Sequence, residues 1–121
     1  MQFIDSDTNF PISSAVVHSG RVFEAVVTGI PDGQRTPVAG GAAAEMREAF
    51  RQLDVLLAQA GVDRRAVCTA RLYLHDVLAD VAEVNTVWKE YFGDHPVVRR
   101  CYGVVLQAGM KVEAAFTAEI P

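Results

Sequence analysis

Two charged residues near the C-terminus stand in apolar sequence and could do chemistry together. Arg99 lies in the β-branched run 97–105, and Glu113 lies between Val112 and Ala114. A carboxylate among apolar residues is costly to bury unless it is partnered or faces a wet cleft. An arginine can bind a carboxylate through two parallel hydrogen bonds. We therefore expect Arg99 and Glu113 either to form a cross-strand ion pair at a sheet edge or to converge on a ligand.

Strand alternation separates Arg99 from its neighbour Arg100. Side chains along a strand alternate between faces, so Arg99 shares a face with Cys101, and Arg100 lies on the opposite face. A thiol close to two guanidinium groups has one feature of a catalytic thiolate. A small apolar thiol filling a sheet face is nevertheless the favoured interpretation of Cys101. Cys101 and Cys68 could pair, but two isolated thiols are expected to be reduced and buried here.

Other residues that could bind a metal ion or a phosphate do not have the spacing that such binding needs. His18, His75 and His95 lie in three separate segments without metal-ligand spacing, so no metal site is expected. Gly40-Gly41 could cradle a phosphate, but neither of the usual glycine-rich phosphate motifs surrounds it.

The strands and helices that position these groups can be predicted from the sequence. Alternating β-branched runs predict five strands, at 14–18, 21–28, 66–75, 97–105 and 111–120. Apolar residues at helical spacing predict helices over 46–60 and 80–92, the second with Asp80 as its N-cap. The order β-β-α-β-α-β-β indicates one α+β domain, residues 1–121, with a mixed sheet and both helices on one face. Apolar residues on the other sheet face favour oligomerisation.

Composition narrows the function further. The chain has 121 residues, the size of one ordinary domain. Its net charge of −4 argues against a general nucleic-acid binder. No apolar run approaches the ~20 residues that span a bilayer, and the N-terminus does not read as a signal peptide. We expect a cytoplasmic protein without membrane or nucleic-acid partners.

Three segments resemble those of one protein family. The C-terminal stretch Arg99–Glu113, reading RRCYGVVLQAGMKVE, resembles the signature of the RidA/YjgF family, also called the L-PSP family. In that signature, an arginine after a proline-containing stretch is tied by fixed spacing to a Val/Ile-Glu pair. The segment 76–92, with Val84-Asn85 inside it, and the turn Thr28-Gly29-Ile30-Pro31 resemble two further family segments. The likeness covers nearly the whole chain in element order.

The resemblance implies a fold and a reaction. The fold is the chorismate-mutase-like α+β domain, assembled as a homotrimer with sites in the clefts between subunits. The reaction is the hydrolysis of reactive enamines and imines to 2-oxo acids and ammonia, without metal or cofactor. Arg99 would hold the substrate carboxylate and Glu113 would position or activate the attacking water. The Cys101 backbone would help hold that water, and Thr28 and Asn85 would line the pocket.

The chain also departs from the family pattern. Ile12 stands where the family has an aromatic residue, so the wall of the pocket differs. The usual small 2-imino acid is therefore only one of the substrates that we consider. Arg100 offers a second guanidinium near the substrate, which would exchange roles with Arg99 if the register were shifted by one. A non-catalytic trimer that binds small carboxylates is the alternative function. Ribonuclease activity is the weakest candidate, because the chain is acidic.

Overall fold

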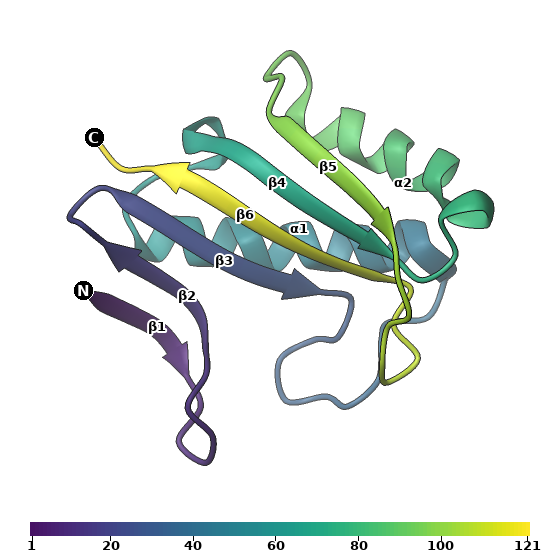
Figure 1. Cartoon of the computed structure of the whole chain (residues 1–121), viewed down its shortest axis with the longest axis horizontal. Helices are drawn as coiled ribbons and strands as arrows, with labels where there is room; N and C mark the ends of the chain where they lie inside the picture. The colour runs from purple at the N-terminus through teal and green to yellow at the C-terminus, as the bar shows by residue number, and fades with distance from the viewer.

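The computed structural model describes residues 1–121 as a six-stranded sheet with two helices packed on one face (Figure 1). The elements are β1 (Gln2–Ser6), β2 (Ser13–His18), β3 (Val22–Thr28), α1 (Gly41–Gln59), a 3-10 turn (Arg64–Ala66), β4 (Val67–Leu74), α2 (Val77–Phe92), β5 (Val98–Gly103) and β6 (Val112–Glu119). The strand order is β1-β2-β3-β6-β4-β5. Only β4 and β5 pair in parallel, so the sheet is mixed. The α+β class with both helices on one face is confirmed.

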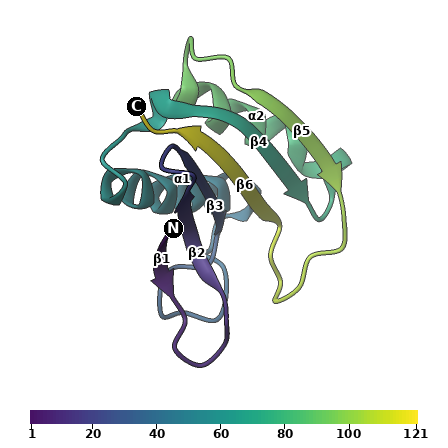
Figure 2. The same ribbon diagram turned by 60° about the vertical axis from the view of Figure 1, so that its left-hand side comes forward.

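A tight hairpin joins β2 and β3. Ser19 and Gly20 both have positive φ, at 55° and 71°. Two such residues match the right-handed twist of the flanking strands, which turns of ordinary hand would splay. The paired strands are strongly twisted, and the β1–β2 hairpin extends away from the helices (Figure 2). The turn therefore sets β2 and β3 side by side.

Three local details differ from the sequence-based prediction. β1 was not predicted, because only Ile4 of its five residues is buried and no alternation marks the strand. Asp76, not Asp80, is the N-cap of α2, and its carboxylate accepts a hydrogen bond from the Ala79 N–H at 3.2 Å. The Asp80 prediction is wrong because the helix begins one turn earlier. β5 ends at Gly103, so the apolar residues that follow leave the sheet.

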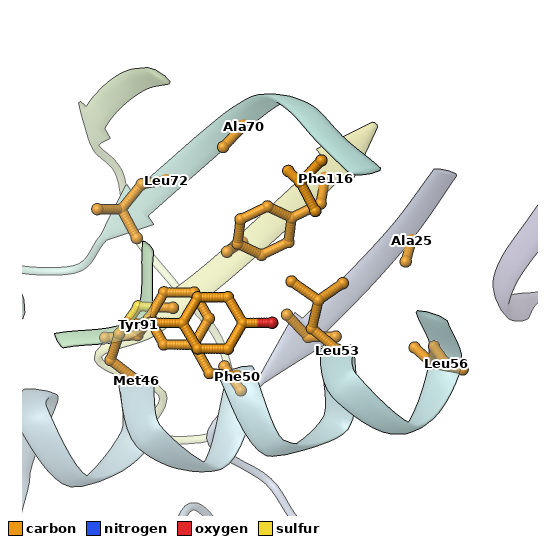
Figure 3. Packing of buried hydrophobic residues seen from close by; sticks show 14 of the residues in the cluster. Ala25, Met46, Phe50, Leu53, Leu56, Ala70, Leu72, Tyr91 and Phe116 are labelled. Atoms are coloured by element: carbon orange, nitrogen blue, oxygen red, sulfur yellow. The ribbon is translucent and has the colours of Figure 1, made fainter. Parts of the chain in front are cut away.

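The hydrophobic core lies between the helices and one face of the sheet. Along β6, the buried residues alternate with half-buried ones, and the buried ones face the helices: Val112, Ala114, Phe116 and Ala118. Phe50 of α1 sits at the centre, where its ring stacks on Tyr91 of α2 at 3.8 Å (Figure 3). The same ring meets Phe92 edge-on and lies 6.0 Å from Phe116. One aromatic side chain thus joins both helices to the central strand.

The other face of the sheet has no helix over it. Side chains between the buried positions point to this side, among them Val26, Arg71, Glu113 and Ala115. We call this side the open face. It carries large apolar side chains such as Val26, which is 50% exposed.

Truncating the central ring should be costly. Phe50→Ala removes the contacts of α1 with α2 and β6 that this ring makes, and is expected to lower the free energy of unfolding by about 3–5 kcal/mol. Urea denaturation followed by circular dichroism measures this loss. Val55→Ala, at an exposed position of the same helix, is the matched control and should change stability by less than about 1 kcal/mol. Equal losses for the two variants would contradict the central role of Phe50.

Candidate functional site

Arg99 turns toward α2, at the edge of the sheet. Its Nη1 donates a hydrogen bond to Asn85 Oδ1 at 2.9 Å, and its guanidinium carbon lies 4.8 Å from the centre of the Trp88 ring. The side chain is half-buried and takes part in none of the chain's ion pairs. An amide and an aromatic face therefore fix the guanidinium while most of its N–H donors stay free. A group held in this way can receive the carboxylate of a ligand.

Glu113 lies on the open face, away from Arg99. Its neighbours Val112 and Ala114 are buried against the helices, so the Glu113 side chain points to the opposite side. In the sheet, it is the register partner of Thr28 on β3 and of Tyr73 on β4. It forms no ion pair. The structure thus brings Glu113 and Thr28 together, at the end of the sheet where β3 finishes and β6 begins.

The predicted cross-strand ion pair between Arg99 and Glu113 is wrong. β4 lies between β5 and β6, and the two side chains are on opposite faces. The physical reason is the β4–α2–β5 connection, because a strand–helix–strand unit sets its two strands parallel and, here, side by side. β6 then pairs with the free edges of β3 and β4. Arg100 shares the open face with Glu113.

The remaining predicted residues are scattered around these two groups. Cys101 follows Arg99 on the helix side, half-buried and with a free thiol. Cys68 is also free, but it is exposed at a bulge of β4, so its predicted burial is wrong. Thr28 Oγ1 accepts a hydrogen bond from the Ile30 N–H at 3.1 Å. Ile12 is 58% exposed and lines a cavity of about 630 Å³ on the open face, apart from Arg99.

Two residues next to these groups were missed. Trp88 of α2 packs against the hydrophobic core, and its ring also supports the Arg99 guanidinium. Its position three residues after Asn85 was the available signal, since such residues share a helix face. Gln52 of α1 holds the turn after β3: its Oε1 accepts from the Thr28 N–H and its Nε2 donates to the Ile30 carbonyl.

Glu45 ties the loops beside Glu113 to the helix layer. It is only 2% exposed, and its Oε1 accepts a hydrogen bond from the Lys111 N–H at 2.8 Å. Gly29 packs so closely on it that a β-carbon there would lie 2.5 Å from Glu45 Cβ. Burial raises the pKa of the Glu45 carboxyl, although the backbone N–H groups of Lys111 and Val112 oppose the shift. The β3–α1 and β5–β6 loops therefore meet on one buried side chain, that of Glu45.

The structure carries no group of three His, Cys, Asp or Glu side chains placed to hold a metal ion. None of its helices combines the length and the apolar character needed to cross a bilayer.

The fold and these residues can now be compared with known proteins. A family model described as Endoribonuclease L-PSP matches residues 6–120. The chain belongs to this family, the RidA/YjgF family that its C-terminal segment resembles.

Curated relatives and solved structures agree with this assignment. The chain is 32% identical over 104 residues to a 2-iminobutanoate/2-iminopropanoate deaminase of Bos taurus, covering 85% of this chain and 75% of that protein. The protein of the same name from Homo sapiens is 29% identical over the same shares. The E. coli TdcF structure with bound serine has a TM-score of 0.86 at 18% identity, over 100% of both chains. A YjgF family member from Neisseria meningitidis has a TM-score of 0.79 at 25% identity, over 99% of this chain and 94% of that one.

The buried Glu45 predicts a pH-dependent stability difference. Since its pKa is raised from 4.5 in the folded chain, ionising it costs stability, and the contribution of Glu45 to stability falls as the pH rises from 4.5 through the raised pKa. Glu45→Gln has no carboxyl to ionise and keeps an acceptor for Lys111. Its free energy of unfolding relative to wild type should therefore improve as the pH rises toward neutrality.

Urea denaturation across this pH range measures the difference. Glu45→Ala is the control, because it also has no carboxyl but loses the acceptor for Lys111, and it should be less stable than Glu45→Gln by about 1–3 kcal/mol at every pH. A constant difference between Glu45→Gln and wild type would show that Glu45 does not titrate as described.

Proposed function

We propose that this protein hydrolyses small 2-imino acids to 2-oxo acids and ammonia. The observation that carries the proposal is the Arg99 guanidinium, which Asn85 and Trp88 hold in place with no carboxylate partner from the chain. It provides an anchor for the carboxylate that every 2-imino acid carries. The deaminases named above, related at about 30% identity, support the same reaction.

The reaction needs a proton carrier as well as an anchor. Water adds to the carbon of the C=N bond, its proton passes to a base, and the resulting carbinolamine expels ammonia to leave the carbonyl. Glu113 is the carboxylate proposed to take and return this proton. Thr28 stands beside it as a pocket residue, and the Cys101 backbone would help hold the water.

The placement of Arg99 and Glu113 bears on where the site lies. In one chain the two side chains are separated by β4 and by the thickness of the sheet. A small substrate cannot touch both. We therefore propose that a site combines Arg99 of one copy with Glu113 of a neighbouring copy in a homotrimer. The apolar side chains of the open face support such an assembly.

A non-catalytic carboxylate-binding function is the second candidate. It is favoured by the same separation, because a single chain offers an anchor without a base beside it. A test for turnover of an imine distinguishes deamination from carboxylate binding without catalysis. Cleavage of RNA, which the family description mentions, has less support in a chain of net charge −4.

Removing the anchor should strongly slow deamination. Ammonia release is measured from 2-iminobutanoate generated in place by a dehydratase, with and without the purified protein. Arg99→Ala should lower kcat/KM by about a hundredfold, since an ionic hydrogen-bonded contact to the carboxylate is lost. Arg21→Ala, at an exposed surface ion pair, is the control and should keep full activity. Full activity of Arg99→Ala would refute the anchor, and no turnover by wild type would leave the binding function.

Mixing two inactive variants tests the shared site. Glu113→Gln should lower kcat by about 10²–10⁴-fold with little change in KM, as loss of a general base does. In oligomers coexpressed from Arg99→Ala and Glu113→Gln chains, about a quarter of the sites should regain both native residues. Recovery of activity would support a site built from two copies. If the mixture stays as inactive as its parents, Arg99 and Glu113 do not act from different chains.

A further inference from the structure

Three polar residues of α1 lie beside its apolar stripe and contact the loops at one end of the sheet. Glu45, Glu48 and Gln52 are spaced three and four apart, so they share one face of the helix. Glu45 is the only charged residue of the chain that is buried, and the other two are half-buried. Polar residues of a surface helix normally face solvent. We call these three residues the polar stripe of α1.

The amide of Gln52 is held in one orientation by its three hydrogen bonds. Its Oε1 accepts from the Thr28 N–H at 3.2 Å, and its Nε2 donates to the Ile30 carbonyl at 2.8 Å. Nε2 also donates to Glu48 Oε2 at 2.7 Å. A carboxylate only accepts, so the nitrogen of the amide must face Glu48. Arg51 holds Glu48 in turn through two hydrogen bonds, at 2.8 and 2.9 Å.

Glu45 contacts the end of β3 and the start of β6 at the same time. Its Oε1 accepts from the Lys111 N–H, two residues before Glu113. Gly29, the residue after Thr28, packs on it so closely that no β-carbon would fit between them. Thr28 and Glu113 are register partners in the sheet. The polar stripe therefore holds the backbone of both strands at the place where these two residues meet.

The Glu113 carboxylate depends on this backbone for its position. It forms no ion pair within the chain that would hold it from the side-chain end. A general base must lie within about 3 Å of the proton that it takes, and a displacement of about 1 Å can cost roughly a hundredfold in rate. The contacts that fix the start of β6 thus bear directly on the proposed proton transfer.

We propose that Glu45 and Gln52 are positioning residues for Glu113, a role that rests on the proposed deamination. Glu45 fixes the backbone just before Glu113. Gln52 fixes Thr28, the residue that pairs with Glu113 across the two strands. Neither side chain touches the substrate. The helix layer thereby places the base through the backbone, independently of the carboxylate anchor at Arg99.

Steady-state kinetics of Glu45→Met and Gln52→Met chains test the proposal. Both substitutions remove the hydrogen bonds and keep a side chain of similar length. Each should lower kcat for 2-iminobutanoate by about tenfold with little change in KM, since the Arg99 anchor is untouched. Glu45→Gln keeps an acceptor for the Lys111 N–H and should regain most of the kcat that Glu45→Met loses. Gln59→Met, at an exposed position of the same helix, is the matched control and should change neither constant.

A second background separates positioning from a simple loss of folded protein. If the polar stripe acts through Glu113, the two methionine substitutions should change the residual kcat of Glu113→Gln by less than about twofold. A chain that is only destabilised would lose the same factor in the wild-type and the Glu113→Gln backgrounds. Circular dichroism gives the folded fraction of every chain.

The outcomes that overturn this role differ from those that overturn deamination. Full kcat in both methionine variants would show that the polar stripe does not position the base. Equal losses in the two backgrounds, or unfolding of both variants, would show that it only stabilises the fold. In these cases wild-type turnover still supports deamination, and the positioning role alone fails. Absence of turnover in the wild type would refute deamination and this role with it.

Discussion

The place of β4 between β6 and β5 is the constraint on which the arrangement of functional groups depends. The β4–α2–β5 unit makes these two strands parallel neighbours, and β6 closes the sheet by pairing antiparallel with both β3 and β4. As a result, Arg99 lies under α2 at one edge, and Glu113 lies on the open face at the start of the inner strand β6. The topology, more than any side-chain contact, decides which groups one chain can bring together.

Local patterns in the sequence were sufficient to predict most elements but not their neighbours. Helix α1 follows from the spacing of Met46, Phe50 and Leu53, because one apolar stripe must face the core. Strand alternation correctly separated Arg99 from Arg100, since it depends only on adjacent residues. We expected β5 and β6 to be neighbours because they follow each other in the chain. Pairing between strands that are distant in the sequence decided the strand order instead. β1 was missed because five residues with one buried side chain carry too weak a pattern.

The candidate site shows the same division between local and non-local information. The contact between Arg99 and Asn85 joins a strand and a helix that follow each other in the chain, and both residues were singled out by family likeness. The role of Glu45 could not be foreseen, because it depends on a loop 66 residues away. A buried carboxyl that accepts backbone hydrogen bonds can hold loops in place without a charged side chain as its partner. No pattern of charges in the sequence therefore indicates such a contact. Such contacts appear only once the fold has brought the segments together.

The position of β5 at the edge of the sheet affects how readily folded molecules aggregate with one another. One side of its backbone has no neighbouring strand, and it carries exposed Val98 and Tyr102, which would suit pairing with the edge of another molecule. Two consecutive arginines in the middle of β5 place a positive charge above and below that edge. Stacking two such edges would bring four guanidinium groups together, a strong deterrent to the growth of continuous sheets between molecules. The two consecutive arginines of β5 therefore protect the folded protein against edge-to-edge aggregation.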